Sequence, residues 1–241
     1  MTPMRLRRQL RALQACTAAS ALGMVFLAAS AFRQGATSRQ RFGEIDAERI
    51  NIVDADGRVR LVIANSARQA VAVVDGRQLL PDRKRDAGLI FFNDEGDENG
   101  GMTWSGATTD GVPRATAGLS FDQYKQEETI TLRYSQTGTE RQAGLTVADR
   151  PDASIAAVAR MNDATTDAKR AKIRQELSDA GVLASRPRVF AGKDRSGDAK
   201  VVLSDGDGKP RLALSVDRKG AAKIEFLDAA GRVIHSVRPP S

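Results

Sequence analysis

The residues best suited to chemistry lie in one acidic segment, residues 93–101, which reads Asn-Asp-Glu-Gly-Asp-Glu-Asn-Gly-Gly. It places four carboxylates within five residues, at Asp94, Glu95, Asp97 and Glu98. Carboxylate and amide oxygens are the ligands that Ca²⁺ takes in proteins. The spacing of Glu95, Asp97 and Asn99 imitates the start of an EF-hand loop, which makes these three residues the candidate metal ligands and Ca²⁺ the candidate cofactor.

The same segment also fits an acidic hairpin turn in solvent. An EF-hand loop begins with Asp and ends with a bidentate Glu at its twelfth position. Here the first ligand is Glu95, the twelfth position is Gly106, and no helical pattern flanks the segment. The simpler expectation is therefore a protein without a resident metal, and a calcium-stabilised adhesion module is an alternative.

Aromatic residues make up 5% of the chain, and three of them lie among polar residues. Trp104 is the single tryptophan, and Phe121 and Tyr124 flank two polar residues. Mixed aromatic and polar surfaces are common at protein contacts. Together with Asp94 and Glu98, these aromatic residues form the set of candidate interaction residues, with core packing as the alternative role for Phe121.

The chain has one cysteine and one histidine, which narrows the possible enzyme classes. Cys16 lies in an apolar N-terminal segment, so the rest of the chain has no thiol for catalysis and no Cys-containing zinc site. His235 stands alone, and a single His on a strand is more often packed or solvated than catalytic. We expect a protein that is not an enzyme and assign no catalytic residue. Paired carboxylates for glycoside hydrolysis stay open, because spacing in sequence does not fix their separation in space.

The formal net charge of +7 suggests a nucleic-acid partner until the charges are located. Four arginines, Arg5, Arg7, Arg8 and Arg11, precede the first apolar segment. The remaining chain carries 33 basic and 30 acidic residues with interleaved signs. A nearly balanced body favours an ordinary solvated surface, so we expect no nucleic-acid partner.

The N-terminus predicts a membrane anchor. Residues 12–32 contain no charge and are long enough for one helix to span a bilayer core of about 30 Å. The basic tail at residues 1–11 would keep that end in the cytoplasm, so a single-pass protein is expected. A linker at residues 33–43 would then lead to an extracytoplasmic domain at residues 44–241. A cleaved signal peptide is the alternative, with Ala29-Ser30-Ala31 as its cleavage site.

Repeated turns predict the architecture of the domain. Asp-x-x-Gly occurs four times between residues 194 and 231, with glycines eleven, twelve and eleven residues apart, and a fifth copy begins at Asp54. Asp accepts local backbone N–H bonds, and Gly supplies the positive φ of a tight turn. The runs between turns alternate apolar and polar residues, as half-buried strands do. We therefore predict a mainly β protein, an antiparallel meander of short strands joined by these turns.

A second repeat occupies the middle of the chain. Residues 87–91, 117–121 and 143–147 share the pattern Ala-Gly-Leu-x-apolar, which extends the predicted meander over residues 45–149. Residues 75–86, with Pro81 and several charges, predict an exposed loop. Residues 154–183 are rich in Ala, Lys, Arg, Glu and Gln and predict a short helical insertion that lies on the β body.

Four motifs resemble those of a family of uncharacterised bacterial proteins with an N-terminal membrane segment and a β-rich body. They are Glu48-Arg-Ile-Asn-Ile-Val-Asp-x-Asp-Gly57, Gly88-Leu-Ile-Phe-Phe-Asn-Asp-Glu-Gly-Asp-Glu-Asn-Gly-Gly101, Phe121-Asp-Gln-Tyr-Lys-Gln126 and Asp149-Arg-Pro-Asp152. The resemblance implies a class and a location at the cytoplasmic membrane, with the body in the periplasm or outside. It implies no activity and no site residues.

The anchor, the repeated turns and the near-neutral body favour a structural or accessory subunit of a larger membrane assembly. Its partners would be the membrane and other subunits of a photosynthetic, respiratory or secretion complex. An envelope polysaccharide-binding or hydrolytic domain that uses Asp94 to Glu98 is the alternative from a different functional class.

Overall fold

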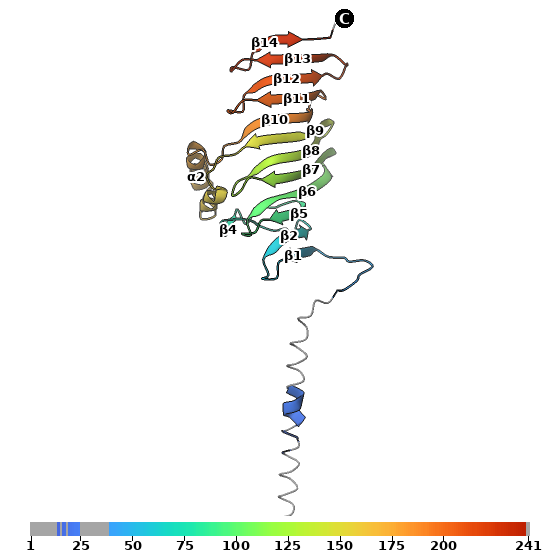
Figure 1. Ribbon diagram of the computed structural model, residues 1–241, viewed down its shortest axis with the longest axis vertical. Helices are drawn as coiled ribbons and strands as arrows, with labels where there is room; N and C mark the ends of the chain where they lie inside the picture. The colour runs from blue at the N-terminus through green and yellow to red at the C-terminus, as the bar shows by residue number, and fades with distance from the viewer. Residues whose placement is uncertain (1–13, 15, 18, 25–38, 240–241) are drawn as a thin grey trace, which may run out of the picture. The chain divides into compact units, whose positions relative to one another are not determined.

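The computed structural model describes residues 14, 16–17, 19–24 and 39–239 (Figure 1). The chain separates into two compact units, Met1–Asp46 and Ala47–Ser241. In the first unit, residues 19–24 are helical, and none of the helices described has the length and apolar content that crossing a membrane requires. The basic tail, most of the expected span at residues 12–32 and the first part of the linker lie outside the described residues.

The second unit is built on one antiparallel sheet of twelve strands (Figure 1). Apart from an excursion through β3 and β4, each strand lies beside its neighbour in sequence, so the predicted meander is confirmed. The sheet is open, and β1 and β14 form its two edges. Its strands are β1 (Arg49–Val53), β2 (Val59–Ala64), β5 (Ala87–Phe92), β6 (Glu98–Thr109), β7 (Val112–Asp122), β8 (Glu128–Thr137), β9 (Glu140–Asp149), β10 (Arg186–Lys193), β11 (Ala199–Ser204), β12 (Pro210–Val216), β13 (Ala222–Leu227) and β14 (Val233–Val237).

The Asp-x-x-Gly turns have the geometry that the sequence predicts. In the β12–β13 turn, the Gly220 N–H donates to the Asp217 carbonyl at 3.0 Å, and the Asp217 carboxylate accepts the N–H groups of Lys219 and Ala221 at 2.8 and 2.9 Å. Gly220 has a φ of 92°, which only glycine adopts without strain. The backbone N–H donors hold the pKa of Asp217 below its usual value. These aspartates are therefore turn-forming residues.

The Ala-Gly-Leu repeat occurs at equivalent positions in the register of the sheet. It starts β5 and recurs in β7 and β9, which run in the same direction with one antiparallel strand between each pair. Ala87, Ala117 and Ala143 consequently lie at one level of the sheet, where Trp104 and Tyr134 pair with them from the intervening strands. Small and large side chains therefore alternate along this row of the sheet.

Strands β6 to β9 contain 12, 11, 10 and 10 residues, so they are longer than four-residue turns that recur every eleven or twelve residues would allow. The difference arises because Asp-x-x-Gly turns set the strand length only near the two edges of the sheet. In the middle, the β6–β7 connection is made by Asp110 and Gly111, both with positive φ. The chain turns there without an Asp-x-x-Gly signal, so the strands extend.

The prediction of an exposed loop over residues 75–86 is wrong in its first part. β3 (Ala72–Val74) and β4 (Arg77–Leu79) form a separate hairpin, and Leu79 is buried. Two helices follow β9 within the predicted insertion, the 3₁₀ helix η2 (Ile155–Met161) and α2 (Asp167–Asp179). The hairpin packs on η2, and η2 packs on α2, so these elements share a small core.

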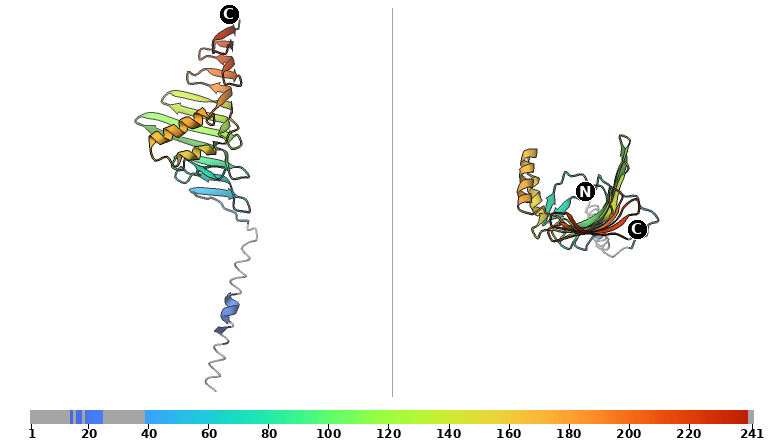
Figure 2. Two further views of the ribbon diagram at one scale, coloured as in Figure 1. Left: turned by 90° about the vertical axis from the view of Figure 1, so that its left-hand side faces the viewer. Right: turned by 90° about the horizontal axis from the view of Figure 1, so that it is seen from above.

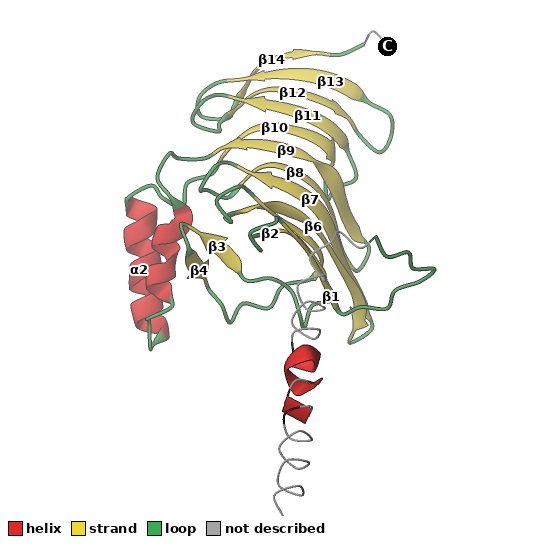
Figure 3. Ribbon diagram, turned by 60° about the horizontal axis from the view of Figure 1, so that its bottom comes forward, coloured by secondary structure: helices red, strands yellow, loops and turns green. Residues whose placement is uncertain are grey.

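The sheet is curved, and the hairpin and helices occupy the inner side of the curve (Figures 2 and 3). A second small core of Val62, Ala64, Ala70 and Ile90 joins the inner side of β2 and β5 to the segment that leads to the hairpin. Strands β10 to β14 continue beyond this cover (Figure 1).

Candidate functional site

An unbroken apolar row crosses the whole sheet on the side away from the helices. Residues that pair directly across adjacent strands lie on the same face. Following these pairs from β1 to β14 gives Ile50, Ile63, Leu89, Met102, Leu119, Leu132, Leu145, Ala191, Val201, Leu214, Ile224 and Val237. Every strand contributes one residue, and each is apolar.

A second apolar row runs beside the first. It contains Ile52, Leu61, Phe91, Phe121, Ile130, Val147, Val189, Leu203, Leu212 and Phe226, and ends on His235. At β6 the row is interrupted by Gly100, and the rings of Phe91 and Phe121 stack across this gap with centroids 6.2 Å apart. We call the two rows together the apolar face.

The apolar face is open to solvent in the single chain. Leu132 is 55% exposed, Phe121 43% and Leu203 40%, although large apolar side chains on a sheet are normally packed against a second layer. The Trp104 side chain beside the first row is 47% exposed. Large contiguous apolar patches on a soluble surface mark sites of contact with another molecule.

A polar cavity of about 380 Å³ lies on the inner side of the sheet. The β3–β4 hairpin and η2 border it with Leu79 and Ile155, and the sheet lines it with small hydroxyl residues such as Ser120 and Thr131. The charged residues that line the cavity include Arg85, Glu98 and Asp122. Arg85 donates to Glu98 at 2.8 Å and to the carbonyl of Ala70 at 3.2 Å.

Asp122 is the most perturbed group in this cavity. Burial and the nearby carboxylates of Glu98, Glu128 and Glu127 raise the pKa of Asp122 to about 8. Among the residues that the structure describes, none forms a hydrogen bond with the buried Oδ1 atom of Asp122. Burial also raises the pKa of Glu127. Asp122 therefore keeps its proton at neutral pH, which is the state of a general acid.

The predicted acidic segment forms the β5–β6 turn, and its carboxylates are tied to neighbouring elements. Asp97 is 2% exposed, and its Oδ1 atom accepts the N–H of Asp75 at 2.8 Å from the tip of the β3–β4 hairpin. Glu95 accepts the Tyr124 hydroxyl at 3.0 Å and pairs with Lys125 at 3.3 Å. The segment therefore locks the β5–β6 turn to the hairpin and to the β7–β8 turn.

The other candidate residues of the acidic segment do not converge on one site. Asp94 pairs with Arg60 and Glu98 pairs with Arg85 inside the cavity, whereas Asn99 lies in β6. Glu95 and Asp97 take different partners, as described above. Within residues 39–239 and the described N-terminal positions, no group of three or more His, Cys, Asp and Glu residues is arranged to hold a metal ion.

The aromatic candidates fall on two surfaces. Phe121 belongs to the apolar face and Trp104 lies beside it, whereas Tyr124 is on the β7–β8 turn and is 61% exposed. His235 ends the second row against the ring of Phe226, 5.8 Å away. The candidate interaction residues from the sequence include Phe121 on the apolar face and Trp104 beside it, but the sequence interpretation did not predict that the face is uncovered.

The cluster around Asp122 was missed altogether. A signal for it exists in the sequence, because Asp122 and Glu128 flank the β7–β8 turn and pair across it. What brings Glu98 and Arg85 to the same place is the packing of the hairpin segment on the sheet, which no local pattern encodes.

Comparisons of the chain with protein-family models, with curated proteins and with solved structures give no significant match. The assignment of function therefore depends on the surfaces described above.

Proposed function

We propose that the protein is a non-enzymatic, membrane-anchored accessory subunit whose extracytoplasmic β domain docks a partner protein along the apolar face and so stabilises a larger membrane assembly. The observation that carries the proposal is the unbroken apolar row across twelve strands, which no second layer from residues 39–239 covers. The anchor in this proposal rests on the uncharged segment at residues 12–32.

The size of the apolar face suits a stable interface. Twelve strands spaced by about 4.8 Å give a length of about 50 Å, and two to three rows give a width of about 15–20 Å. The product, about 750–1,000 Å², is close to the roughly 800 Å² that each partner contributes to a standard protein interface. Neither row contains Asp, Glu, Lys or Arg, and charged residues are likewise depleted at interface centres.

A matched pair of substitutions tests the proposal. Leu132 lies in the apolar face, and Arg133 is its exposed neighbour on the opposite face of β8. The full chain is extracted in mild detergent from its native membrane, and its native size is measured. We expect the wild type and Arg133→Glu to migrate in a large assembly and Leu132→Glu to lose at least about tenfold of that assembly, as for a buried interface residue.

A monomeric wild type under every gentle extraction condition would contradict the proposal. So would equal loss of assembly for the two variants, because the effect would then not depend on the face that carries the substitution.

A further inference from the structure

The sheet has two free edges, β1 and β14. Among the residues that the structure describes, β1 pairs only with β2, and β14 pairs only with β13. All five residues of each edge strand are exposed. β14 contains no Asp, Glu, Lys, Arg or Pro, and β1 contains one of these, Arg49 at its start. Soluble proteins usually place charges or proline along a free edge, because its unpaired N–H and C=O groups can pair with another strand.

The two edges are complementary in direction. Every neighbouring pair of the twelve strands is antiparallel, so the first strand, β1, and the last strand, β14, run in opposite directions. The β14 edge of one copy can therefore pair antiparallel with the β1 edge of a second copy in the same orientation. An odd number of strands would bring parallel edges together, and parallel pairing is slightly less stable for each residue.

The two edges also match in register. Residues 50–52 of β1 begin three rows of directly paired residues, and these rows end on residues 235–237 of β14 in the reverse order. An antiparallel ladder requires this reverse order. The bulges in the edge pairs lie outside these residues. In this register, the pairs between two copies are Ile50 with Val237, Asn51 with Ser236, and Ile52 with His235.

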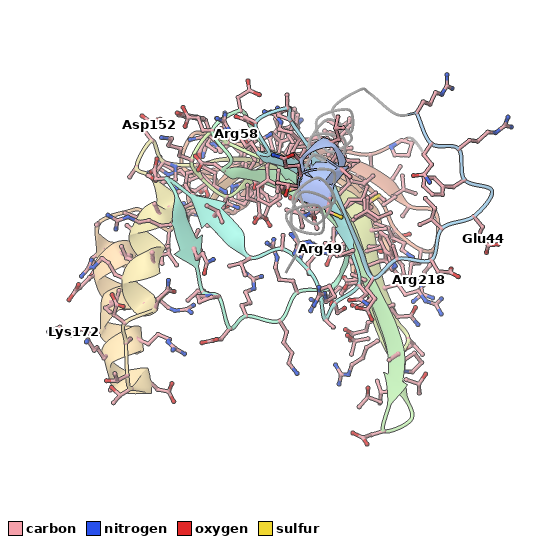
Figure 4. All side chains as sticks on the ribbon, turned by 90° about the horizontal axis from the view of Figure 1, so that it is seen from below. Glu44, Arg49, Arg58, Asp152, Lys172 and Arg218 are labelled. Atoms are coloured by element: carbon pink, nitrogen blue, oxygen red, sulfur yellow. The ribbon has the colours of Figure 1, made fainter. Side chains whose placement is uncertain are left out.

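One pair of charges opposes this contact. In the same register, Arg49 of one copy would lie opposite Arg238, the residue that follows β14, of the other copy. The Arg49 side chain, labelled in Figure 4, donates to the Asn51 side chain at 2.8 Å and to the Arg68 carbonyl at 3.0 Å. Like charges directly opposite each other weaken strand pairing. The strength of the contact should therefore respond to the charge at residue 238.

We propose that copies of this protein associate end to end, with the β14 edge of one copy added as a strand to the β1 edge of the next. A second copy is favoured over a strand of another protein because direction, register and side-chain type all match between the chain's own two edges. The two edges are different surfaces, so the contact is heterologous and association continues beyond a dimer. The inference goes beyond the proposed function, since it concerns the strand edges and not the apolar face.

Disulfide trapping in the full chain, in its native membrane, tests this contact. Two copies with tags of different size are expressed together, one with Asn51→Cys and the other with Ser236→Cys, both with Cys16→Ser. Cu²⁺–phenanthroline then oxidises the thiols. Residues directly opposite each other in a ladder are close enough for a disulfide. Positions 51 and 236 lie at opposite edges of one sheet, so a disulfide between them must join two copies.

We expect a linked pair from these two variants and a ladder of longer oligomers from a chain that carries both substitutions. In the matched control, Ser215→Cys replaces Ser236→Cys. Ser215 lies on β12, which is not an edge strand, and should give no link.

A charge reversal tests the register. Arg238→Glu would place a carboxylate opposite Arg49, so it should raise the yield of the linked pair about twofold to fivefold. Combining Arg238→Glu with Arg49→Glu restores a pair of like charges and should return the yield to its starting level. Arg218→Glu makes the same change of charge on the β12–β13 turn and should leave the yield unchanged.

Absence of a link between positions 51 and 236 overturns the inference, as does an equal link in the Ser215 control. Links of 51 to 51 or of 236 to 236 in higher yield also overturn it, because each edge would then pair with its own kind. A Ser236→Cys chain that links only to a different protein has the same consequence. An equal gain from Arg218→Glu and Arg238→Glu would contradict the register.

Discussion

Asp122 illustrates how burial sets the charge of a single residue in this domain. Its carboxyl group lines the inner cavity beside Glu98, Glu127 and Glu128, with Arg85 as the nearby cation that opposes the shift. Ionisation there would add a further negative charge in a poorly solvated place. The pKa therefore rises from the model-peptide value of 3.8 to about 8.

The raised pKa of Asp122 predicts a pH-dependent stability. A carboxyl group whose pKa is higher in the folded state makes folding less favourable as pH rises from the unfolded value near 4 through the folded value near 8. At about pH 9, Asp122→Asn should therefore raise the free energy of unfolding by about 2–4 kcal/mol, and near pH 4 it should change little. Urea titrations at the two pH values measure this difference. An equal effect at both pH values would show that the carboxyl group does not carry the shift.

Close backbone contact explains several glycines within the strands. A Cβ atom on Gly192 would lie 2.2 Å from the carbonyl oxygen of Ala143 and 2.5 Å from the Cα atom of Gly144, and these backbone atoms cannot rotate away. Gly206, in the β11–β12 turn, has no atom within 4 Å of its Cβ position.

This contrast gives a second prediction. Gly192→Ala should reduce the free energy of unfolding by at least about 1–3 kcal/mol, because the sheet must separate locally to admit the methyl group. Gly206→Ala is the matched control, with an expected change within about 0.5 kcal/mol. Thermal or urea unfolding of the two variants distinguishes them, and similar stabilities would refute the close contact.

At the scale of elements, the hairpin, η2 and α2 form a unit with its own core. Ile173 and Leu177 are the residues that α2 buries, and they join Val74 and Leu79 of the hairpin through η2. Strands β11 to β14 contribute nothing to this core. Stability is therefore expected to differ between the two regions.

Leu177→Ala tests this separation. Removing a side chain that is 3% exposed should cost the small core about 2–5 kcal/mol. Hydrogen exchange should accelerate in residues 155–182 and stay unchanged in β11 to β13. Lys172→Ala, on the exposed side of α2, should leave both regions within about 0.5 kcal/mol of the wild type. Faster exchange throughout the sheet would mean that the core is not a separate unit.

The elements differ in how well the sequence predicts them. The turns were predicted because Asp217 and Gly220 act within five residues, through local hydrogen bonds and a positive φ. The hairpin was missed because Leu79 is buried by η2, which lies about eighty residues later in the chain. The charged residues and Pro81 that follow Leu79 are typical of an exposed loop.

The same limit applies to the candidate site. Alternation along a strand predicts that one face is apolar, as it does for Leu132 between Thr131 and Arg133. Whether a second layer covers that face depends on segments far away in the chain, and here the helical insertion packs on the hairpin at the inner side instead. The acidic segment was identified as a site because its residue types suit a metal, whereas its contacts with Asp75 and Lys125 assign it to the packing of three turns.

At the scale of the whole domain, the principal feature is a sheet with one layer over much of its extent. Each inner strand of the sheet contacts the strand on either side of it, so the stability of the sheet accumulates largely from neighbouring pairs. A partner that covers the apolar face would supply the missing second layer. Burial by such a partner would explain why every strand of the sheet contributes an apolar residue to the row.

The most direct test places a photo-crosslinking amino acid at Leu132 and Leu203 on the apolar face, and at Arg133 and Lys200 on the opposite face, in the full chain within its native membrane. Our account predicts crosslinks to the same partner from both apolar-face positions and none from the other two. Adducts that form equally from both faces, or none from the apolar face, would contradict it.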